Sequence, residues 1–143
     1  MKRILFLCTG NYYRSRFAEE YWNHHADRRG LDWRADSRAL LRDFAGAGNR
    51  GPISRHAVAE LERRRIPITG ALRVPRRLEA TDLDGFQRVV AMSRAEHAPM
   101  VEAPFPAARY RIDYFEIGDV EIESPAVAIG RLERCLDELM QSL

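Results

Sequence analysis

The sequence predicts an α/β fold in which a four-stranded parallel sheet is covered by helices on both faces. Short apolar segments alternate along the chain with longer segments of helical spacing, which is typical of a parallel sheet. The strands are expected near residues 3–8, 33–38, 86–91 and 109–116. The helices are expected near residues 14–28, 54–65, 94–101 and 124–141. Because such sheets bind ligands at the carboxyl ends of their strands, a site is expected in the segments that follow the strands.

The first strand and the first helix are predicted most directly. The run Ile4–Leu7 is apolar throughout and too short for a helix, so it suits a strand buried on both faces. From Arg14 onwards the larger apolar residues recur at spacings of three and four, which gives a helix one face for packing on the sheet. These residues are Phe17, Ala18, Tyr21 and Trp22.

The later elements carry start signals and apolar patterns. Ser54 can cap the second helix. Ser124 followed by Pro125 suits the start of the last helix, because the first helical position needs no N–H group. The third strand is predicted from Val89, Val90, Ala91 and Met92. The apolar stripe of the last helix is predicted to be Val127, Leu132, Leu136 and Leu139.

Length and cysteine content predict one cytoplasmic domain. Residues 1–143 are enough for one hydrophobic core and leave no room for a second domain. No apolar segment is long enough to span a membrane, and the apolar run after Met1-Lys2-Arg3 is shorter than the core of a secretory signal. Cys8 and Cys135 are the only cysteines, so a disulfide-stapled secreted fold is not indicated. We therefore expect a cytoplasmic protein with no membrane partner.

The charge balance argues against nucleic acid as a partner. The chain has 23 basic and 21 acidic residues, and the net charge of +2 is too small to indicate such binding. The four histidines and two cysteines do not show the spacing of a ligand set, so we expect no metal ion and no other cofactor. Nothing in the sequence indicates an oligomeric state.

The segment Cys8-Thr9-Gly10-Asn11-Tyr12-Tyr13-Arg14-Ser15 joins the first strand to the first helix. The N–H groups and the positive dipole end of the helix favour an anion there, and Gly10 lets the backbone curl around it. Arg14 can bind two phosphoryl oxygens at once, and its charge favours the nucleophilic thiolate form of Cys8. The segment therefore predicts a phosphate site. The structural alternative is that Cys8 only ends a core strand and Arg14 is a solvated helix residue.

This segment resembles the phosphate-binding loop of the low-molecular-weight protein tyrosine phosphatases, which reads Cys-x-Gly-Asn-x-Cys-Arg-Ser. The matching residues are Cys8, Gly10, Asn11, Arg14 and Ser15. The resemblance implies a three-layer α/β/α fold of flavodoxin-like topology. It also implies a cysteine-dependent phosphatase that hydrolyses phosphomonoesters, above all protein phosphotyrosine, through a phosphocysteine intermediate. The expected partners are then phosphorylated proteins or small phosphomonoester substrates.

The same resemblance implies roles for the loop residues. Cys8 is the nucleophile, Arg14 binds phosphate, Asn11 holds the unusual loop backbone and Ser15 donates a hydrogen bond to the thiolate. The expected phosphate-binding residues are Thr9, Gly10, Asn11, Tyr12, Tyr13, Arg14 and Ser15. Tyr13 stands where the family has a second loop cysteine, so the protective disulfide of the family cannot form. The rings of Tyr12 and Tyr13 either wall the pocket or fill it.

A phosphatase of this kind needs a general acid, because a protonated leaving oxygen departs more easily than an anion. The family supplies an aspartate from an Asp-Pro pair after the fourth strand. Asp119 lies at the expected distance from the end of the chain, although Val120 replaces the proline. We predict Asp119 as the acid, with Glu121 and Glu123 as substitutes. An alignment on Ser124-Pro125 instead places a serine at this position.

Other segments depart from the family pattern. Ser93 follows Met92 where the family commonly has an aspartate. Residues 120–123 contain none of the aromatic rings that usually contact phosphotyrosine. Residues 40–52 replace a short Gly-rich loop, and Phe44 within them is expected to rim the pocket.

A group of arginines is the last candidate at the pocket mouth. Arg73, Arg76 and Arg77 are expected to face the mouth and to attract acidic phosphoproteins.

Alternatives to an active phosphatase belong to other functional classes. A pseudophosphatase would keep the loop, lack the acid and bind phosphate or phosphoproteins with weak catalysis or none. A phosphocarrier would also place a cysteine after the first strand, although its loop usually lacks the arginine. An arsenate reductase would need further cysteines, for which only Cys135 is present.

Overall fold

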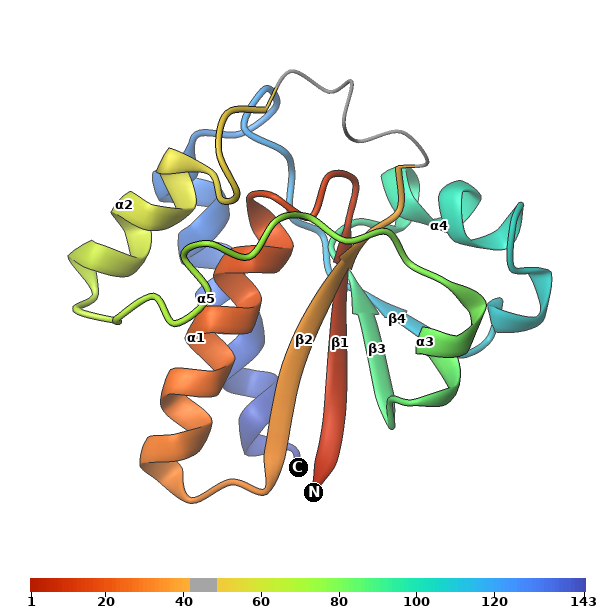
Figure 1. The fold of residues 1–143 in the computed structure, drawn as a ribbon, viewed down its shortest axis with the longest axis horizontal. Coiled ribbons are helices and arrows are strands. Elements are labelled where there is room, and N and C mark those ends of the chain that lie inside the picture. Colours follow the sequence, from red (N-terminus) through yellow and green to blue (C-terminus); the bar gives the residue numbers. More distant parts are fainter. Residues whose placement is uncertain (42–48) are drawn as a thin grey trace.

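The apolar run of the first strand forms the centre of the sheet. Strand β1 (Lys2–Cys8) carries four fully buried side chains, from Ile4 to Leu7. Three further strands run parallel to it, in the order β2-β1-β3-β4 (Figure 1). They are β2 (Trp33–Ala39), β3 (Arg88–Ala91) and β4 (Ile112–Tyr114). This computed structural model describes residues 1–41 and 49–143. The predicted four-stranded parallel sheet is confirmed.

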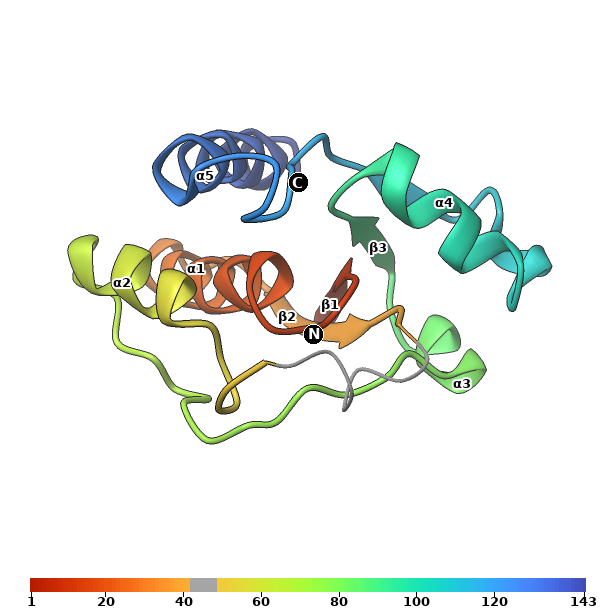
Figure 2. The same ribbon diagram turned by 90° about the horizontal axis from the view of Figure 1, so that it is seen from above.

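Helices cover both faces of this sheet and complete three layers. Figure 2 shows α1, α2 and α5 on one side of the sheet and α3 and α4 on the other. The helices are α1 (Arg14–Arg29), α2 (Arg55–Arg63), α3 (Ala80–Asp84), α4 (Arg94–Glu102) and α5 (Pro125–Gln141), and a 3-10 helix, η2 (Pro106–Ala108), follows α4. The predicted α/β/α architecture is therefore confirmed.

Alternate residues of β1 pack on opposite faces of the sheet. Ile4 and Phe6 belong to the core beneath α1 and α5, where the ring of Trp22 lies edge-on to Phe6 with 5.8 Å between ring centroids. Leu5 and Leu7 belong to a second core beneath α3 and α4. Burial on both faces explains why this strand is apolar throughout rather than alternating.

The predicted helix starts are confirmed. Ser54 precedes α2, and its side chain accepts a hydrogen bond of 3.1 Å from the backbone N–H of His56. Ser124 caps α5 in the same way through Val127, and Pro125 is the first helical residue. Helix α1 ends at Gly30, whose φ of 64° lies in the left-handed region that glycine adopts without steric cost.

Three details differ from the sequence prediction. Val127 is 55% exposed, so its assignment to the core stripe of α5 was wrong, and Ala128 and Ile129 take its place on the buried face. Helix α3 was not predicted, because five residues are too few for a periodic pattern. Strand β4 is shorter than expected, since it lies at the sheet edge and pairs with β3 over three residues only.

The ends of the sheet have different surroundings. Both chain termini lie at the end where β1 begins, and the loop between β1 and α1 lies at the opposite end (Figure 1).

Within residues 1–41 and 49–143, no helix is both long enough and apolar enough to cross a membrane.

Trp22→Ala is expected to lower the free energy of unfolding by about 3–5 kcal/mol, because it removes a fully buried side chain and leaves a cavity beside Phe6. Urea denaturation followed by circular dichroism measures the change. Tyr110→Ala is the control, since Tyr110 is 89% exposed, and should change stability by less than about 0.5 kcal/mol. Equal stability losses in the two variants would contradict this description of the core.

Candidate active site

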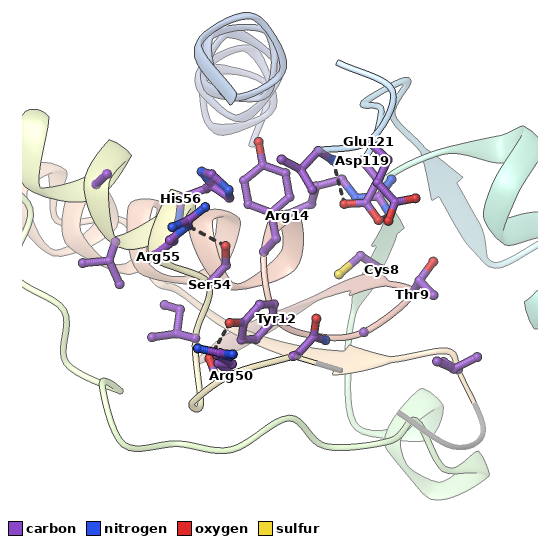
Figure 3. A pocket seen from close by; sticks show the side chains of 18 of the residues that line it. Cys8, Thr9, Tyr12, Arg14, Arg50, Ser54, Arg55, His56, Asp119 and Glu121 are labelled. Atoms are coloured by element: carbon purple, nitrogen blue, oxygen red, sulfur yellow. Dashed lines mark hydrogen bonds and ion pairs between the residues drawn. The ribbon is translucent and has the colours of Figure 1, made fainter. Parts of the chain in front are cut away.

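A pocket of about 950 Å³ opens at the carboxyl end of β1 (Figure 3). One wall is the loop of Cys8 to Ser15, and a second is formed by residues 119–121. The third wall comes from residues 49–62, which lead into and along α2. The pocket therefore lies where parallel sheets of this kind bind ligands.

Asn11 determines the shape of the loop. Its φ of 49° is left-handed, and its side chain is fully buried. Its amide nitrogen donates to the Oγ atoms of Ser15 (2.9 Å) and Ser37 (2.8 Å). Its amide oxygen accepts from Arg73 Nη1 and from the backbone N–H of Arg76, each at 3.1 Å. All four hydrogen-bonding positions of the amide are filled, which offsets the cost of the unusual backbone conformation.

Cys8 is the last residue of β1, and its sulfur faces the pocket (Figure 3). The Sγ atom lies 3.1 Å from Ser15 Oγ. With Cys8 as a thiol, Ser15 Oγ accepts from the sulfur as well as from Asn11, and with Cys8 as a thiolate the rotatable Ser15 hydroxyl can donate its own proton to the sulfur instead. The arrangement suits a thiolate, which can only accept.

Arg14 is the first residue of α1, and only 1% of its surface is exposed. Its Nη1 donates to Glu96 Oε1 (3.1 Å) and to the carbonyl of Ile117 (2.9 Å), and its Nη2 donates to Glu96 Oε2 (2.7 Å). A guanidinium has five N–H groups, so the Nε–H and one Nη2–H have no hydrogen-bond acceptor among the described residues. These two N–H groups share one edge of the guanidinium, the geometry that binds two oxygens of one phosphate.

The charges around Arg14 are tightly coupled. Burial acts to raise the pKa of Glu96, but hydrogen bonds from His97, Arg14 and Thr9 outweigh it and hold that pKa well below its usual range. Burial acts to lower the pKa of Arg14, and its hydrogen bonds to Glu96 and the charge of Cys8 raise it above the ordinary value. The pair is therefore ionised throughout the physiological pH range.

Asp119 lies beside the loop. Its Oδ2 is 3.6 Å from Arg14 Nη2, and its side chain is 40% exposed. Asp119 and Glu121 both line the pocket, and Figure 3 shows their side chains on the opposite side of it from Tyr12. The other predicted substitute, Glu123, is not in this pocket. Its carboxylate binds the backbone N–H of Gly118 (2.7 Å) and the guanidinium of Arg131 (2.7 Å), so it holds the acidic loop in place.

The two loop tyrosines form walls of the pocket. The hydroxyl of Tyr12 donates to the backbone carbonyl of Arg50. Tyr13 is 5% exposed, and its ring meets His56 edge-on with 6.2 Å between centroids. Burial raises the pKa of Tyr13 to about 12, and the charge of Asp119 adds to the effect, so this phenol stays neutral.

The sequence prediction for the arginines of the mouth was wrong. Arg73 points inward and binds Asn11, Ser37 and Glu19, so its contacts are structural. The side chains of Arg76 and Arg77 do not line the pocket. Phe44 lies outside the described residues, whereas Leu41, Asn49 and Arg50 from the same segment line the pocket.

Sequence reasoning also missed Glu96 and His97. Both lie in the first turn of α4, at the end of the sheet where the site was expected. Their place in the helix that follows the third strand was the only feature of the sequence that could have indicated them.

Within residues 1–41 and 49–143, no group of three or more His, Cys, Asp or Glu side chains is arranged to hold a metal ion.

The fold and the loop define an α/β protein with a cysteine and an arginine in one pocket, and comparisons with known proteins show its family. Residues 3–143 match the family model "Low molecular weight phosphotyrosine protein phosphatase". The chain therefore belongs to this phosphatase family, whose substrates are phosphorylated, and the resemblance seen in the sequence is confirmed. A search of curated proteins gives no match.

Solved structures share the whole fold. The low molecular weight protein tyrosine phosphatase from T. tengcongensis is 25% identical, with a TM-score of 0.82 and 100% coverage of both chains. The YwlE arginine phosphatase from Geobacillus stearothermophilus is 23% identical, with a TM-score of 0.75 and coverage of 99% of this chain and 92% of that one. Vibrio vulnificus Wzb, solved with benzylphosphonate, is 16% identical, with a TM-score of 0.75 and coverages of 99% and 95%.

Substitution of Asn11 tests what shapes the loop. Asn11→Gly should lower the free energy of unfolding by about 1–3 kcal/mol, because removal of the amide side chain leaves its buried partners without hydrogen bonds. Asn11→Ala should lose about 1 kcal/mol more, because alanine is also disfavoured in the left-handed conformation. Urea denaturation of both variants measures the difference. If alanine is tolerated as well as glycine, the loop does not depend on the left-handed residue.

Proposed function

We propose that this protein hydrolyses phosphomonoesters, above all phosphotyrosine in proteins, through a phosphocysteine intermediate. The observation that carries the proposal is that Cys8, the unused edge of Arg14 and the carboxyl group of Asp119 meet in one pocket. These three groups are a nucleophile, a phosphate-binding group and a proton donor, which are the parts that this reaction needs.

In the first step, two phosphoryl oxygens bind the Nε–H and the remaining Nη2–H of Arg14, and the loop N–H groups bind the phosphate as well. The Cys8 thiolate attacks phosphorus, an S–P bond forms and the bond to the leaving oxygen breaks. Asp119 protonates that oxygen as it departs, which requires its carboxyl group to carry a proton when substrate binds. Its partly exposed position beside Arg14 lets it reach a leaving group at the pocket mouth.

In the second step, water attacks the phosphocysteine. The Asp119 carboxylate takes a proton from this water, the S–P bond breaks, and inorganic phosphate and the Cys8 thiolate are released. The hydroxyl of Ser15, 3.1 Å from the sulfur, stabilises the thiolate as it leaves.

The pocket walls support an aromatic substrate. Residues 120–123 provide no ring, but the side chains of Tyr12, Tyr13 and Ile53 line the pocket. A volume of about 950 Å³ accommodates a phosphorylated side chain together with neighbouring residues. Arg50 and Arg55 also line the pocket and suit acidic residues beside the phosphate.

A second substrate class, phosphoarginine, is favoured by the carboxylates of Asp119 and Glu121 in the pocket. A guanidinium leaving group would pair with such carboxylates. One structural relative is an arginine phosphatase. Comparing kcat/KM for a phosphotyrosine peptide and a phosphoarginine peptide of otherwise identical sequence distinguishes the two classes.

The arsenate reductase alternative is not proposed. Cys135 lies on α5 and packs against the core, and it does not line the pocket that contains Cys8. The described pocket therefore offers Cys8 no second cysteine as a partner for oxidation.

Cys8→Ser should lower kcat for p-nitrophenyl phosphate by at least roughly a thousandfold, because serine is a far weaker nucleophile at this position. Affinity for inorganic phosphate should remain, since the rest of the loop is unchanged. Steady-state kinetics and calorimetry measure the two effects. Turnover that persists in Cys8→Ser would remove Cys8 from the mechanism, whereas a native protein that binds phosphate without turnover would be a pseudophosphatase.

Asp119→Asn should lower kcat by roughly a hundredfold or more on phenyl phosphate, because phenolate is a poor leaving group without a proton. The loss should be smaller on p-nitrophenyl phosphate, whose leaving group needs less protonation. Glu121→Gln is the matched control from the same pocket wall. Equal losses on both substrates would show that Asp119 is not the acid, and a leaving-group effect in Glu121→Gln would assign the role to Glu121.

A further inference from the structure

Glu96 makes the strongest contacts of any side chain with the phosphate-binding arginine. Its two carboxylate oxygens accept from Nη1 and Nη2 of Arg14 at 3.1 and 2.7 Å. The side chain of Arg14 is 2% exposed and that of Glu96 is 30% exposed. A carboxylate bound end-on to a buried guanidinium neutralises its charge and restricts its orientation.

Glu96 reaches Arg14 from behind the phosphate pocket. It is not among the residues that line the pocket with Cys8, but lines a smaller hollow together with Ser93, Glu116 and Ile117. The carbonyl of Ile117 accepts from the same Nη1 of Arg14. Glu96 therefore occupies the Nη1–Nη2 edge of the guanidinium and Ile117 takes the second N–H of Nη1, so the Nε–Nη2 edge remains for phosphate.

Helix α4 and His97 hold Glu96 in place. Ser93 begins the helix, and its Oγ accepts from the backbone N–H of Glu96 at 3.3 Å. His97 is fully buried, and its Nδ1 accepts from the backbone N–H of Ser93 at 3.1 Å. The proton of the neutral ring is therefore on Nε2, which lies 2.9 Å from Glu96 Oε2. The carboxylate is thus held by an oriented donor as well as by the helix.

The same carboxylate also contacts the loop. The hydroxyl of Thr9, the residue after the nucleophile, donates to Glu96 Oε2 and lies 3.0 Å from His97 Nε2. Glu96 therefore connects the two ends of the anion loop, Thr9 near its start and Arg14 near its end. A shift of this carboxylate would therefore move both Thr9 and the guanidinium of Arg14.

We propose that Glu96, held by His97, is a positioning residue for phosphate binding: it orients Arg14 so that the Nε edge faces the phosphate, and it anchors Thr9. The inference deepens the proposed function, on which it rests for the identity of the ligand. The position after Met92, where the family commonly has an aspartate, is Ser93 here, and the carboxylate that binds Arg14 end-on comes from Glu96, three residues later in the first turn of α4.

The opposite role would be competition. A carboxylate that occupied the phosphate position would weaken phosphate binding, and its removal would strengthen it. The location of Glu96 outside the phosphate pocket argues for positioning, and the sign of the change in affinity distinguishes the two roles.

The test is calorimetric titration of the full chain with inorganic phosphate, which needs no turnover. Glu96→Gln keeps the size of the side chain and removes the charge, and its Kd for phosphate should rise at least about tenfold. Glu102→Gln is the control, because Glu102 lies at the other end of α4 and its side chain is 42% exposed. Its Kd should remain within about twofold of the native value. A purely structural effect would lower the fraction of molecules that bind and leave Kd unchanged.

Glu96→Asp is a second variant, which keeps the test decisive if Glu96→Gln does not fold. It keeps the charge with one methylene fewer, and its Kd should lie between those of the native protein and Glu96→Gln. An unchanged or tighter Kd in whichever variant folds would overturn the proposal. A native chain that binds phosphate but does not hydrolyse p-nitrophenyl phosphate would contradict the proposed function. The Kd values of the Glu96 variants for phosphate would still decide the role of Glu96.

Discussion

The burial of one positive charge, the guanidinium of Arg14, is the constraint on which the site depends. A buried cation is stable only if acceptors surround it, and the structure provides Glu96 and the carbonyl of Ile117. These acceptors come from α4 and from the segment after β4, so two distant parts of the chain must close on the loop. Because they occupy both N–H groups of Nη1 and one of Nη2, the Nε edge that we propose for phosphate is oriented in advance, and such preorganisation lowers the cost of binding.

The loop itself is held by a second set of buried contacts on its other side. Asn11 is bound by Arg73 and by the backbone of Arg76, both from the long segment that connects α2 to α3. Glu20 fixes the same segment to α1, because its carboxylate accepts from the backbone N–H groups of Thr69 and Gly70 at 3.0 and 2.9 Å. The loop is therefore supported from both sides by side chains that do not line the pocket.

The sequence predicted the features that consecutive residues determine, and it did not predict contacts between residues that are far apart in the chain. The sheet, the loop of Cys8 to Ser15 and the helix caps at Ser54 and Ser124 all follow from short segments with their own physical signals. The resemblance to a family position pointed to Asp119, and Asp119 does line the pocket, whereas its role as the acid stays a prediction. By contrast, Glu96 meets Arg14 across 82 positions, and no local pattern marks that contact.

Charge on an arginine was also a poor guide to its location. Arg73 was expected at the surface near the pocket mouth, yet its side chain is 14% exposed and bound to Glu19. Tertiary ion pairs decide whether such a side chain turns inward, and they are not visible in composition or spacing. The same reason applies to Glu123, which was considered as an acid and proved to be paired with Arg131.

The proposed function requires that Cys8 carries the phosphoryl group during turnover. Rapid acid quenching of the native protein during hydrolysis of p-nitrophenyl phosphate, followed by mass spectrometry of its peptides, tests this most directly. We expect one phosphoryl group on the peptide that contains Cys8, formed as fast as turnover requires and absent in Cys8→Ser. Steady turnover with no phosphorylated Cys8 at any quench time, or with the phosphoryl group on another residue, would contradict it.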